Sequence, residues 1–395
     1  MTEAAPLDGV GIVYFGNAWH AENRTSSHHI ASGLSRTAPV LYVDSPGIRA
    51  PRGSGRDVRR AFRKLAAALS KPVQVAPGLW HCTVPQVPLR RLPGVDAFNA
   101  AFGRWAVRRA MRAVGFRRCI SWFTVPHPGH LAGRLGDEFR VYYCTDDYSA
   151  FPGVDEALIA ARDRELSMRA DLLFVATPAL EAPKRALNPR TVFSPHGVDV
   201  ALFRQALDAD TEVPAAVRDL PRPVIGYIGS IHEWVDLDLL AWLAAERPQW
   251  SFLMVGHAAT DVSALRAMPN VRFVGPQPYA ELGRWSKAID VALIPQRRNR
   301  WIANANPLKL REYLAAGRPV VSVRNPEIEK FSRWVRIADD GASFLAAIEA
   351  SLLDRGLDAA EERVAAVAGQ TWEHRVDSVV ATLLEHFNRH QPATT

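Results

Sequence analysis

The sequence predicts an α/β protein that contains two doubly wound parallel sheets. Its 395 residues exceed the size of one ordinary hydrophobic core, so two domains are expected. Short runs of β-branched and aromatic residues, typical of strands buried on both faces, alternate with segments of helical periodicity. This series stops at a polar, proline-containing stretch near 204–223 and then starts again. Such an alternation is typical of parallel sheets covered by helices on both faces.

The expected elements follow from the apolar runs in chain order. The first half is expected to hold strands over 11–16, 40–46, 119–123, 140–147 and 172–177. Helices are expected there over 97–114 and 155–169. The second half is expected to hold strands over 224–230, 251–256, 271–275, 291–295 and 319–323. A last amphipathic helix is expected over about 371–388, where Val376, Val379, Leu383 and Phe387 recur at helical spacing. The expected domains are therefore 1–203 and 204–370, followed by a closing helical segment, 371–395.

Composition limits the class of protein. A hydrophobic content of 48% and a charged content of 23% are those of a soluble globular protein. No run of 18 or more apolar residues occurs, and the first residues lack the basic and apolar pattern of a signal peptide. The three cysteines, Cys82, Cys119 and Cys144, are far apart and without a CxxC partner, which suits a reducing compartment. We therefore expect a cytoplasmic protein.

The positive charge is concentrated in one block. Residues 49–118 contain 16 Lys and Arg but only Asp57 and Asp96 as acids. Within it, a segment 49–71 sets Arg and Lys beside Phe62, Leu65 and Leu69 in an amphipathic pattern, with the basic residues Arg52, Arg56, Arg59, Arg60, Arg63 and Lys64. Such a segment could lie on an anionic membrane surface; it could equally be a solvated basic helix. No recognised nucleic-acid-binding module accompanies it, so no nucleic-acid partner is expected.

The stretch NANPLKLREYLAAGRPVVSV, residues 304–323, predicts an anion site at the start of a helix. Asn306 suits the N-cap and Pro307 the first helical position, and a helix N-terminus favours a phosphate. Lys309 and Glu312 are three residues apart and share a face. Lys309, beside Leu308, could neutralise a diphosphate, and Glu312 could accept hydrogen bonds from ribose hydroxyls. The alternative is an exposed ion pair on a surface helix.

Two further strand ends add candidates for a nucleotide. Gly229 ends one strand and permits close backbone approach, and Ser230 could donate to a phosphate oxygen. Gly275 and Pro276 follow another strand, where backbone groups could contact a base edge, although a Gly-Pro pair often marks only a turn. The Asp236-Leu237-Asp238 triplet has the form of a metal–diphosphate motif, but Asp236 is better explained as a helix cap. No metal site is expected.

The first half offers candidates for a second substrate. Asp146 and Asp147 follow a strand, and one of them could act as general base for a hydroxyl group, unless they only cap a turn. Polar and aromatic residues follow two other strands and are acceptor-site material or ordinary loop residues: Asn17, Trp19, Arg24, His28 and His127. His127 and His130 have a spacing that suits a metal, but no third ligand is evident.

Several of these segments resemble the bacterial family 4-like glycosyltransferases of the GT-B fold. The resemblance rests on SPHGVDVALF, VGPQPYAEL, PLKLREYLAAGRPVV and TWEHRVDSVV. YYCTDDYSAF and YIGSIHEWVDLDLL are similar to segments of the teichuronic-acid-type subgroup. The resemblance implies two Rossmann-like domains that face a central cleft, with a last helix that crosses back to the first domain. It also implies that the C-terminal domain holds the nucleotide-sugar and the N-terminal domain the acceptor.

The chain departs from the family pattern at three places. Asn304 stands where the family's Glu-x7-Glu pair has its first carboxylate, His196 stands in place of Asn in the crossover motif, and His232-Glu233-Trp234 replaces a basic residue after Ser230. The stereochemical course therefore stays open.

The resemblance implies a metal-independent transfer of a sugar from a nucleoside diphosphate sugar, UDP by default, to a hydroxyl acceptor. A lipid-linked or polysaccharide intermediate is the expected acceptor, reached from the cytoplasmic side of a membrane. No cofactor other than this co-substrate is expected. The alternatives are a sugar-nucleotide epimerase or a phosphorylase of the same fold and, more remotely, a nucleic-acid-binding protein that uses the basic block.

Overall fold

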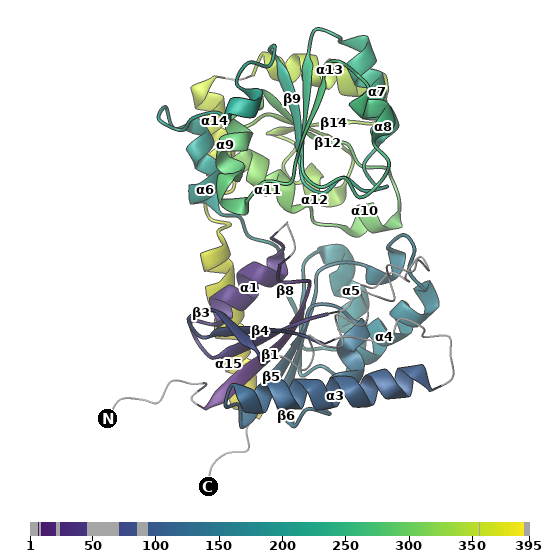
Figure 1. Ribbon diagram of the computed structural model, residues 1–395, viewed down its shortest axis with the longest axis vertical. Helices are drawn as coiled ribbons and strands as arrows, with labels where there is room; N and C mark the ends of the chain where they lie inside the picture. The colour runs from purple at the N-terminus through teal and green to yellow at the C-terminus, as the bar shows by residue number, and fades with distance from the viewer. Residues whose placement is uncertain are drawn as a thin grey trace. The chain divides into compact units, whose positions relative to one another are not determined.

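The computed structural model describes residues 7, 9–20, 24–45, 71–84, 94–354 and 356–390, which form two compact units (Figure 1). Unit 1 contains the described residues before 21, residues 25–195 and the C-terminal residues from Arg375 onward. Unit 2 contains Arg24 and residues 196–374. Each unit is built on one sheet.

The sheet of unit 1 has eight strands in its described residues, in the order β3-β4-β2-β1-β5-β6-β7-β8. Their bounds are β1 Val10–Gly16, β2 Val40–Asp44, β3 Val73–Ala76, β4 Leu79–Thr83, β5 Arg118–Phe123, β6 Asp137–Cys144, β7 Leu172–Val175 and β8 Thr191–Phe193. All pairs are parallel except β3 with β4. The order reverses direction between β1 and β5, and ligands of open α/β sheets bind at such a reversal.

Helices cover both faces of this sheet (Figure 1). They are α1 Ser26–Leu34, α3 Val95–Ala113, α4 Glu156–Arg169 and α5 Pro178–Leu187, with short 3-10 turns over His127–Leu131 and Tyr148–Ala150. Because strand side chains alternate, Val13 and Phe15 pack with α3 and α4, whereas Tyr14 faces the other way and stacks on Tyr42 and Trp122.

The sheet of unit 2 has six parallel strands in its described residues, in the order β11-β10-β9-β12-β13-β14. Their bounds are β9 Val224–Ile228, β10 Ser251–Val255, β11 Val271–Gly275, β12 Val291–Ile294, β13 Val320–Val323 and β14 Val335–Ala338. Counted from β9, this is the 3-2-1-4-5-6 order of dinucleotide-binding folds, whose reversal lies between the first and fourth strands, here β9 and β12.

The helices of unit 2 lie on the two faces of its sheet, with α7, α8 and α13 on one face and α6, α9 and α11 on the other (Figure 1). Their bounds are α6 Val200–Arg204, α7 Leu237–Glu246, α8 Ser263–Arg266, α9 Leu282–Lys287, α10 Arg300–Asn304, α11 Leu308–Ala315, α12 Pro326–Glu329, α13 Gly341–Leu352 and α14 Leu357–Ala365. As the sequence predicts, Asp236 caps α7, and its carboxylate accepts from the Leu239 N–H at 3.1 Å.

The last helix, α15 (Trp372–His390), begins in unit 2 and continues into unit 1 from Arg375. Its apolar stripe is buried there: a Cβ placed on Gly33 of α1 would lie 2.4 Å from a Val376 methyl, and the Phe387 ring meets the Phe139 ring edge-on at 5.6 Å. The motifs SPHGVDVALF and TWEHRVDSVV meet where α15 starts. There the Trp372 N–H donates to the Val198 carbonyl at 3.2 Å.

The chain enters unit 2 at His196, before the expected boundary at 203/204. The reason is α6, whose Phe203 is 1% exposed and belongs to the core of unit 2. The expected strands are all present, but β3, β4, β8 and β14 are additional. No helix in the described residues is both long and apolar enough to cross a membrane. The segment with the basic residues Arg52 to Lys64 lies outside the described residues.

Candidate functional site

Three glycines stand side by side where β9, β10 and β11 end. The Gly229 N–H donates to the Val255 carbonyl at 2.8 Å, and the Gly256 N–H donates to the Gly275 carbonyl at 2.9 Å. Gly229 and Gly256 have φ of 140° and 145°, which favour glycine, and a Cβ on Gly256 would lie 2.0 Å from the Gly229 oxygen. The edge of the sheet therefore carries no side chain at these three positions: the Gly229 carbonyl packs against Gly256, and the space beside Gly275 is open.

Lys309 is in the first turn of α11, and its side chain lies against this glycine edge. A Cβ on Gly229 would lie 3.3 Å from the Lys309 ammonium nitrogen, and that nitrogen is 5.1 Å from the centre of the Tyr227 ring. α11 has its N-terminus here, where the first amide groups of a helix have no acceptor within the helix. A cation and a helix N-terminus thus meet at the end of β9, beside the reversal of the sheet order.

Glu312 follows one turn later on the same face of α11. Leu308, Lys309 and Glu312 are half-buried, whereas the remaining α11 residues are buried, so these three form its accessible face. Burial raises the pKa of Glu312 to about 7, and the nearby Lys309 ammonium offsets part of that rise. Burial, and after it the charge of Glu312, raises the pKa of Tyr279.

The predicted cap of α11 is wrong. Pro307 occupies the N-cap position, and the buried Asn306 accepts a hydrogen bond from Arg311 at 2.6 Å through its side-chain oxygen. Arg311 also donates to Gln370 at 2.8 Å. The Asn306 side chain therefore bonds to the buried face of α11. It does not cap the N-terminus of α11, because its oxygen accepts from the buried Arg311 guanidinium.

Three other residues were predicted to bind the nucleotide-sugar, and they lie after β9 or at the end of β11. Ser230 is half-buried, and its carbonyl accepts from the Tyr227 hydroxyl at 2.9 Å. Gly275 has φ of 72°, and Pro276 beside it is exposed. Gly256, Tyr227 and Tyr279 were not among the predicted residues. Gly256 had a usable signal, since it ends β10 as Gly229 ends β9.

In unit 1, polar side chains gather at the carboxyl ends of β1, β2 and β4. Asp44 accepts hydrogen bonds from the Trp19 N–H at 2.8 Å and from Thr83 at 3.0 Å, and its other contact is His81 at 3.0 Å. Hydrogen bonds from His81 and Trp19 hold the pKa of Asp44 below its usual range despite burial. Sequence reasoning missed Asp44 and His81.

Four of the predicted acceptor residues follow β1, and three of them lie in unit 1 and one in unit 2. Asn17 is exposed, its amide 3.3 Å from the Thr25 hydroxyl, and Trp19 packs on His28 and Tyr42. His28 is buried in the capping box of α1. Arg24 belongs to unit 2, with its guanidinium 5.8 Å from the Tyr279 ring.

His127 and the two aspartates lie at the ends of β5 and β6. His127 is 1% exposed within a 3-10 turn, so its ring is not displayed to a ligand. Asp146 and Asp147 are half-buried after β6; Asp147 accepts from the Ser149 hydroxyl at 2.7 Å. No cluster of three or more His, Cys, Asp or Glu suited to a metal occurs among the described residues.

The part of the chain that holds the bare sheet edge matches a known family. The protein family described as Glycosyl transferases group 1 matches residues 222–354. Residues 222–354 are a group 1 glycosyltransferase domain. A Bacillus subtilis (strain 168) protein, TuaH, provisionally named as a glycosyltransferase of teichuronic acid biosynthesis, is 28% identical over 260 residues. That match covers 60% of this chain and 65% of TuaH, a little less than two thirds of its length.

Solved structures of several proteins share the fold of this chain over most of its length. Sucrose-phosphate synthase of Thermosynechococcus elongatus is 16% identical with a TM-score of 0.70, covering 96% of this chain and 100% of that one. Anabaena HepE, described in complex with UDP and glucose, is 12% identical with a TM-score of 0.62, covering 95% and 99%. A UDP-forming trehalose-phosphate synthase of Burkholderia xenovorans is 14% identical with a TM-score of 0.63, covering 96% and 100%. The chain has the GT-B fold.

Proposed function

We propose that this chain transfers a sugar from a nucleoside diphosphate sugar, with UDP as the nucleotide, to a hydroxyl group of an acceptor. One observation carries the proposal: Lys309 lies against Gly229 and one turn before Glu312, where β9 ends beside the reversal of the sheet order. Lys309 would neutralise the diphosphate, and Glu312 would accept hydrogen bonds from the ribose hydroxyls. The domain match at 222–354 and the UDP described in Anabaena HepE support the choice of ligand.

The reaction would be a displacement at the anomeric carbon. The acceptor oxygen forms a bond to that carbon, and the bond from the carbon to the β-phosphate oxygen breaks. The diphosphate then carries the developing negative charge. The Lys309 ammonium and the free amide groups of α11 are suited to stabilise it, and we propose that they do so without a divalent metal.

The hydroxyl proton of the acceptor must be taken up by a base in either stereochemical course, and inversion calls for a base on the protein. We propose Asp147, or its neighbour Asp146, for that role, because both are half-buried at the carboxyl end of β6. If the configuration is retained, these carboxylates would only position the acceptor, and an oxygen of the departing diphosphate would take the proton. The polar edge around Asn17 and Trp19 in unit 1 supports an acceptor site there.

We propose a glycan or lipid-linked intermediate as the acceptor. The name of TuaH supports a polysaccharide pathway. The segment 49–71 would bring the protein to the inner face of an anionic membrane, where a lipid-linked acceptor is found.

Nucleotide binding tests the proposal. Thermal-shift titrations with UDP, GDP, dTDP, uridine and UDP-sugars, with and without EDTA, would be run on the wild type, Glu312→Ala and Lys309→Ala. We expect UDP to stabilise the wild type whether or not EDTA is present. Glu312→Ala should weaken UDP and uridine alike by tenfold or more, whereas Lys309→Ala should weaken UDP and leave uridine unchanged, since only UDP carries the diphosphate.

Two surface variants serve as controls. Glu349 pairs with Arg247, and Lys330 pairs with Glu327, and none of these four residues is a proposed donor residue. Glu349→Ala and Lys330→Ala should bind UDP like the wild type. If no nucleotide stabilises the wild type, or if the Glu312 and Lys309 variants bind as their controls do, the proposed donor site is wrong.

A further inference from the structure

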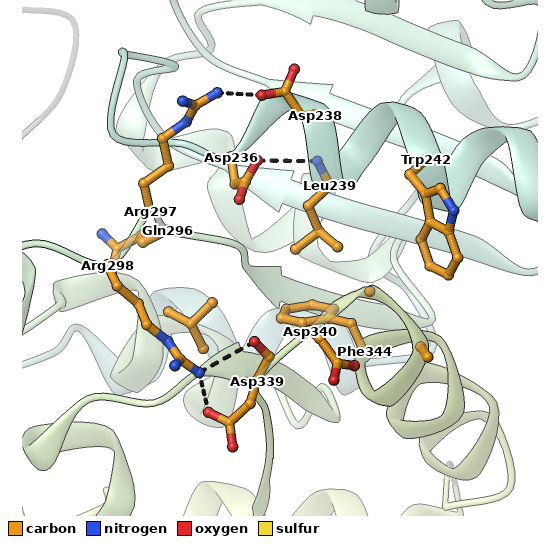
Figure 2. Close-up of a pocket in the computed structure, with 13 residues that line it drawn as sticks. Asp236, Asp238, Leu239, Trp242, Gln296, Arg297, Arg298, Asp339, Asp340 and Phe344 are labelled. Atoms are coloured by element: carbon orange, nitrogen blue, oxygen red, sulfur yellow. Dashed lines mark hydrogen bonds and ion pairs between the residues drawn. The ribbon is translucent and has the colours of Figure 1, made fainter.

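Unit 2 contains a cavity of about 710 Å³ that shares no lining residue with the proposed donor site. It lies beyond the carboxyl ends of β12, β13 and β14, between the first turns of α7 and α13 (Figure 2). Small-molecule sites have this size, and they combine an apolar wall with a few convergent polar groups. The chemistry of the walls indicates what such a cavity would hold.

One wall is polar and carries an excess of negative charge. Arg297 donates to Asp238 at 2.6 Å, and Arg298 pairs with Asp339, so each guanidinium of the lining already has a carboxylate partner (Figure 2). Asp236 and Asp340 cap the two helices; Asp340 accepts from the Ser343 N–H at 2.8 Å.

Two of these acids have lowered pKa values. Arg324 holds the pKa of Asp339 below its usual range, and hydrogen bonds from Ser343 do the same for Asp340. When Arg324 beside Asp339 is included, four carboxylates face three guanidiniums, and this excess of negative charge disfavours a phosphate or a nucleotide. No metal-holding cluster lies in the part of the chain that the structure describes.

The opposite wall is apolar and includes an exposed tryptophan. Leu239 and Trp242 project from α7 toward Phe344 of α13 (Figure 2). The Trp242 side chain is 39% exposed, and a Cβ on Gly341 would lie 2.9 Å from its ring, so the start of α13 holds the indole in place. A fixed, accessible indole is a suitable surface for the C–H groups of a flat, rigid ligand.

Gln296, next to Arg297 on the polar wall, has an unmet hydrogen-bonding requirement (Figure 2). It lines the cavity and is 6% exposed, and its side-chain oxygen is buried without a hydrogen-bond partner. A buried amide oxygen left in this state costs about 1–3 kcal/mol. The terminal torsion of glutamine is soft, so the amide can turn toward the cavity and pair with a ligand hydroxyl.

We propose that this cavity binds an uncharged saccharide, at a site separate from the donor site. Sugar hydroxyls both donate and accept, so they can pair with the carboxylates, the guanidiniums and the Gln296 amide at once, while a ring face packs on Trp242. The cavity is large enough for one or two sugar rings. The site would hold the protein on a glycan chain and takes no part in the transfer.

Saturation-transfer NMR on the full chain tests the proposal directly. The probes are methyl glucoside, methyl galactoside and N-acetylglucosamine, with glucose 6-phosphate as a charged counterpart, in Glu312→Ala protein so that the proposed donor site is disabled. We expect saturation transfer to at least one neutral probe and at least fivefold less to glucose 6-phosphate. Trp242→Ala and Gln296→Leu should each reduce the neutral signal at least fivefold.

Trp105→Ala is the matched control, because Trp105 is 45% exposed on α3 of unit 1 and should not affect the signal. Thermal unfolding would confirm that every variant is folded. The proposal is overturned if no neutral probe receives saturation, if Trp242→Ala leaves the signal intact, or if the phosphate binds better. Because the readout needs neither UDP nor turnover, its failure is distinct from failure of the proposed transfer: UDP binding in Trp242→Ala should stay at the wild-type level.

Discussion

Glu312 has a raised pKa although a lysine lies three residues before it. Burial favours the protonated acid more than Lys309 favours the carboxylate, and the pKa rises from 4.5 to about 7. A carboxyl group poised near neutral pH is a costly feature in a folded protein. Perturbed acids of this kind concentrate at functional sites.

This pKa predicts a pH-dependent gain in stability for Glu312→Gln. Below pH 4.5 the acid is protonated in both the folded and the unfolded chain, so the variant should equal the wild type. Between pH 4.5 and 7 the unfolded chain releases its proton while the folded chain keeps it, and the wild type loses stability as the pH rises. Above pH 7 the variant should be more stable by at most about 3 kcal/mol, less what solvent screens at the accessible side of the group.

Melting temperatures of Glu312→Gln and wild type, measured without nucleotide from pH 4.5 to 8.5, check this prediction. Glu349→Gln is the control, because Glu349 is exposed. A difference that stays constant with pH would show that the Glu312 carboxyl is not shifted.

α11 is held against β9 by one buried hydroxyl. The Ile228 N–H donates to the Tyr313 oxygen at 2.7 Å, and Tyr313 is 1% exposed. The residue after Ile228 is Gly229, so this bond also fixes the spacing between the bare edge and Lys309. Sequence pattern cannot reveal it, since a buried Tyr on a helix looks like any core aromatic.

Tyr313→Phe should therefore destabilise unit 2 by about 1–3 kcal/mol, because the buried Ile228 N–H loses its acceptor while the ring keeps its packing. The melting temperature should fall, and amide hydrogen exchange at Ile228 should accelerate. Unchanged exchange at Ile228 would mean that this amide is satisfied in another way.

Strands with fully buried β-branched runs were predictable, whereas the four missed strands are partly exposed. The buried β-branched runs of β9 and β13 and the helical spacing of Lys309 and Glu312 are local, so the sequence alone was sufficient. β8 has three residues, and β3 pairs antiparallel at an edge, where Val73 is 62% exposed and the usual burial pattern is absent.

Site residues that depend on distant contacts could not be predicted. The charge of Glu312 acts on Tyr279 although 33 positions separate them, and Asp44 meets His81 only because β2 pairs with β4. The prediction that Asn306 caps α11 was wrong for the same reason, because its side-chain oxygen accepts a hydrogen bond from Arg311. A motif states which residue types are present, but the tertiary contacts decide which atoms are available.

At the scale of the whole molecule, the chain returns to unit 1 through α15, while the proposed donor residues all belong to unit 2. Phe387 is 1% exposed and packs edge-on against Phe139, both within unit 1. Removing this ring should affect the stability of unit 1 and leave the geometry of the glycine edge unaltered.

Phe387→Ala should lower the free energy of unfolding of unit 1 by about 3–5 kcal/mol, because it leaves a cavity in a closely packed core. Its dissociation constant for UDP, measured at a temperature where the variant is folded, should equal that of the wild type. Glu385→Ala on the exposed face of α15, where Glu385 pairs with Arg389, is the control and should change stability by less than about 0.5 kcal/mol. A loss of UDP affinity in folded Phe387→Ala protein would contradict the prediction, since the donor site would then depend on unit 1 as well.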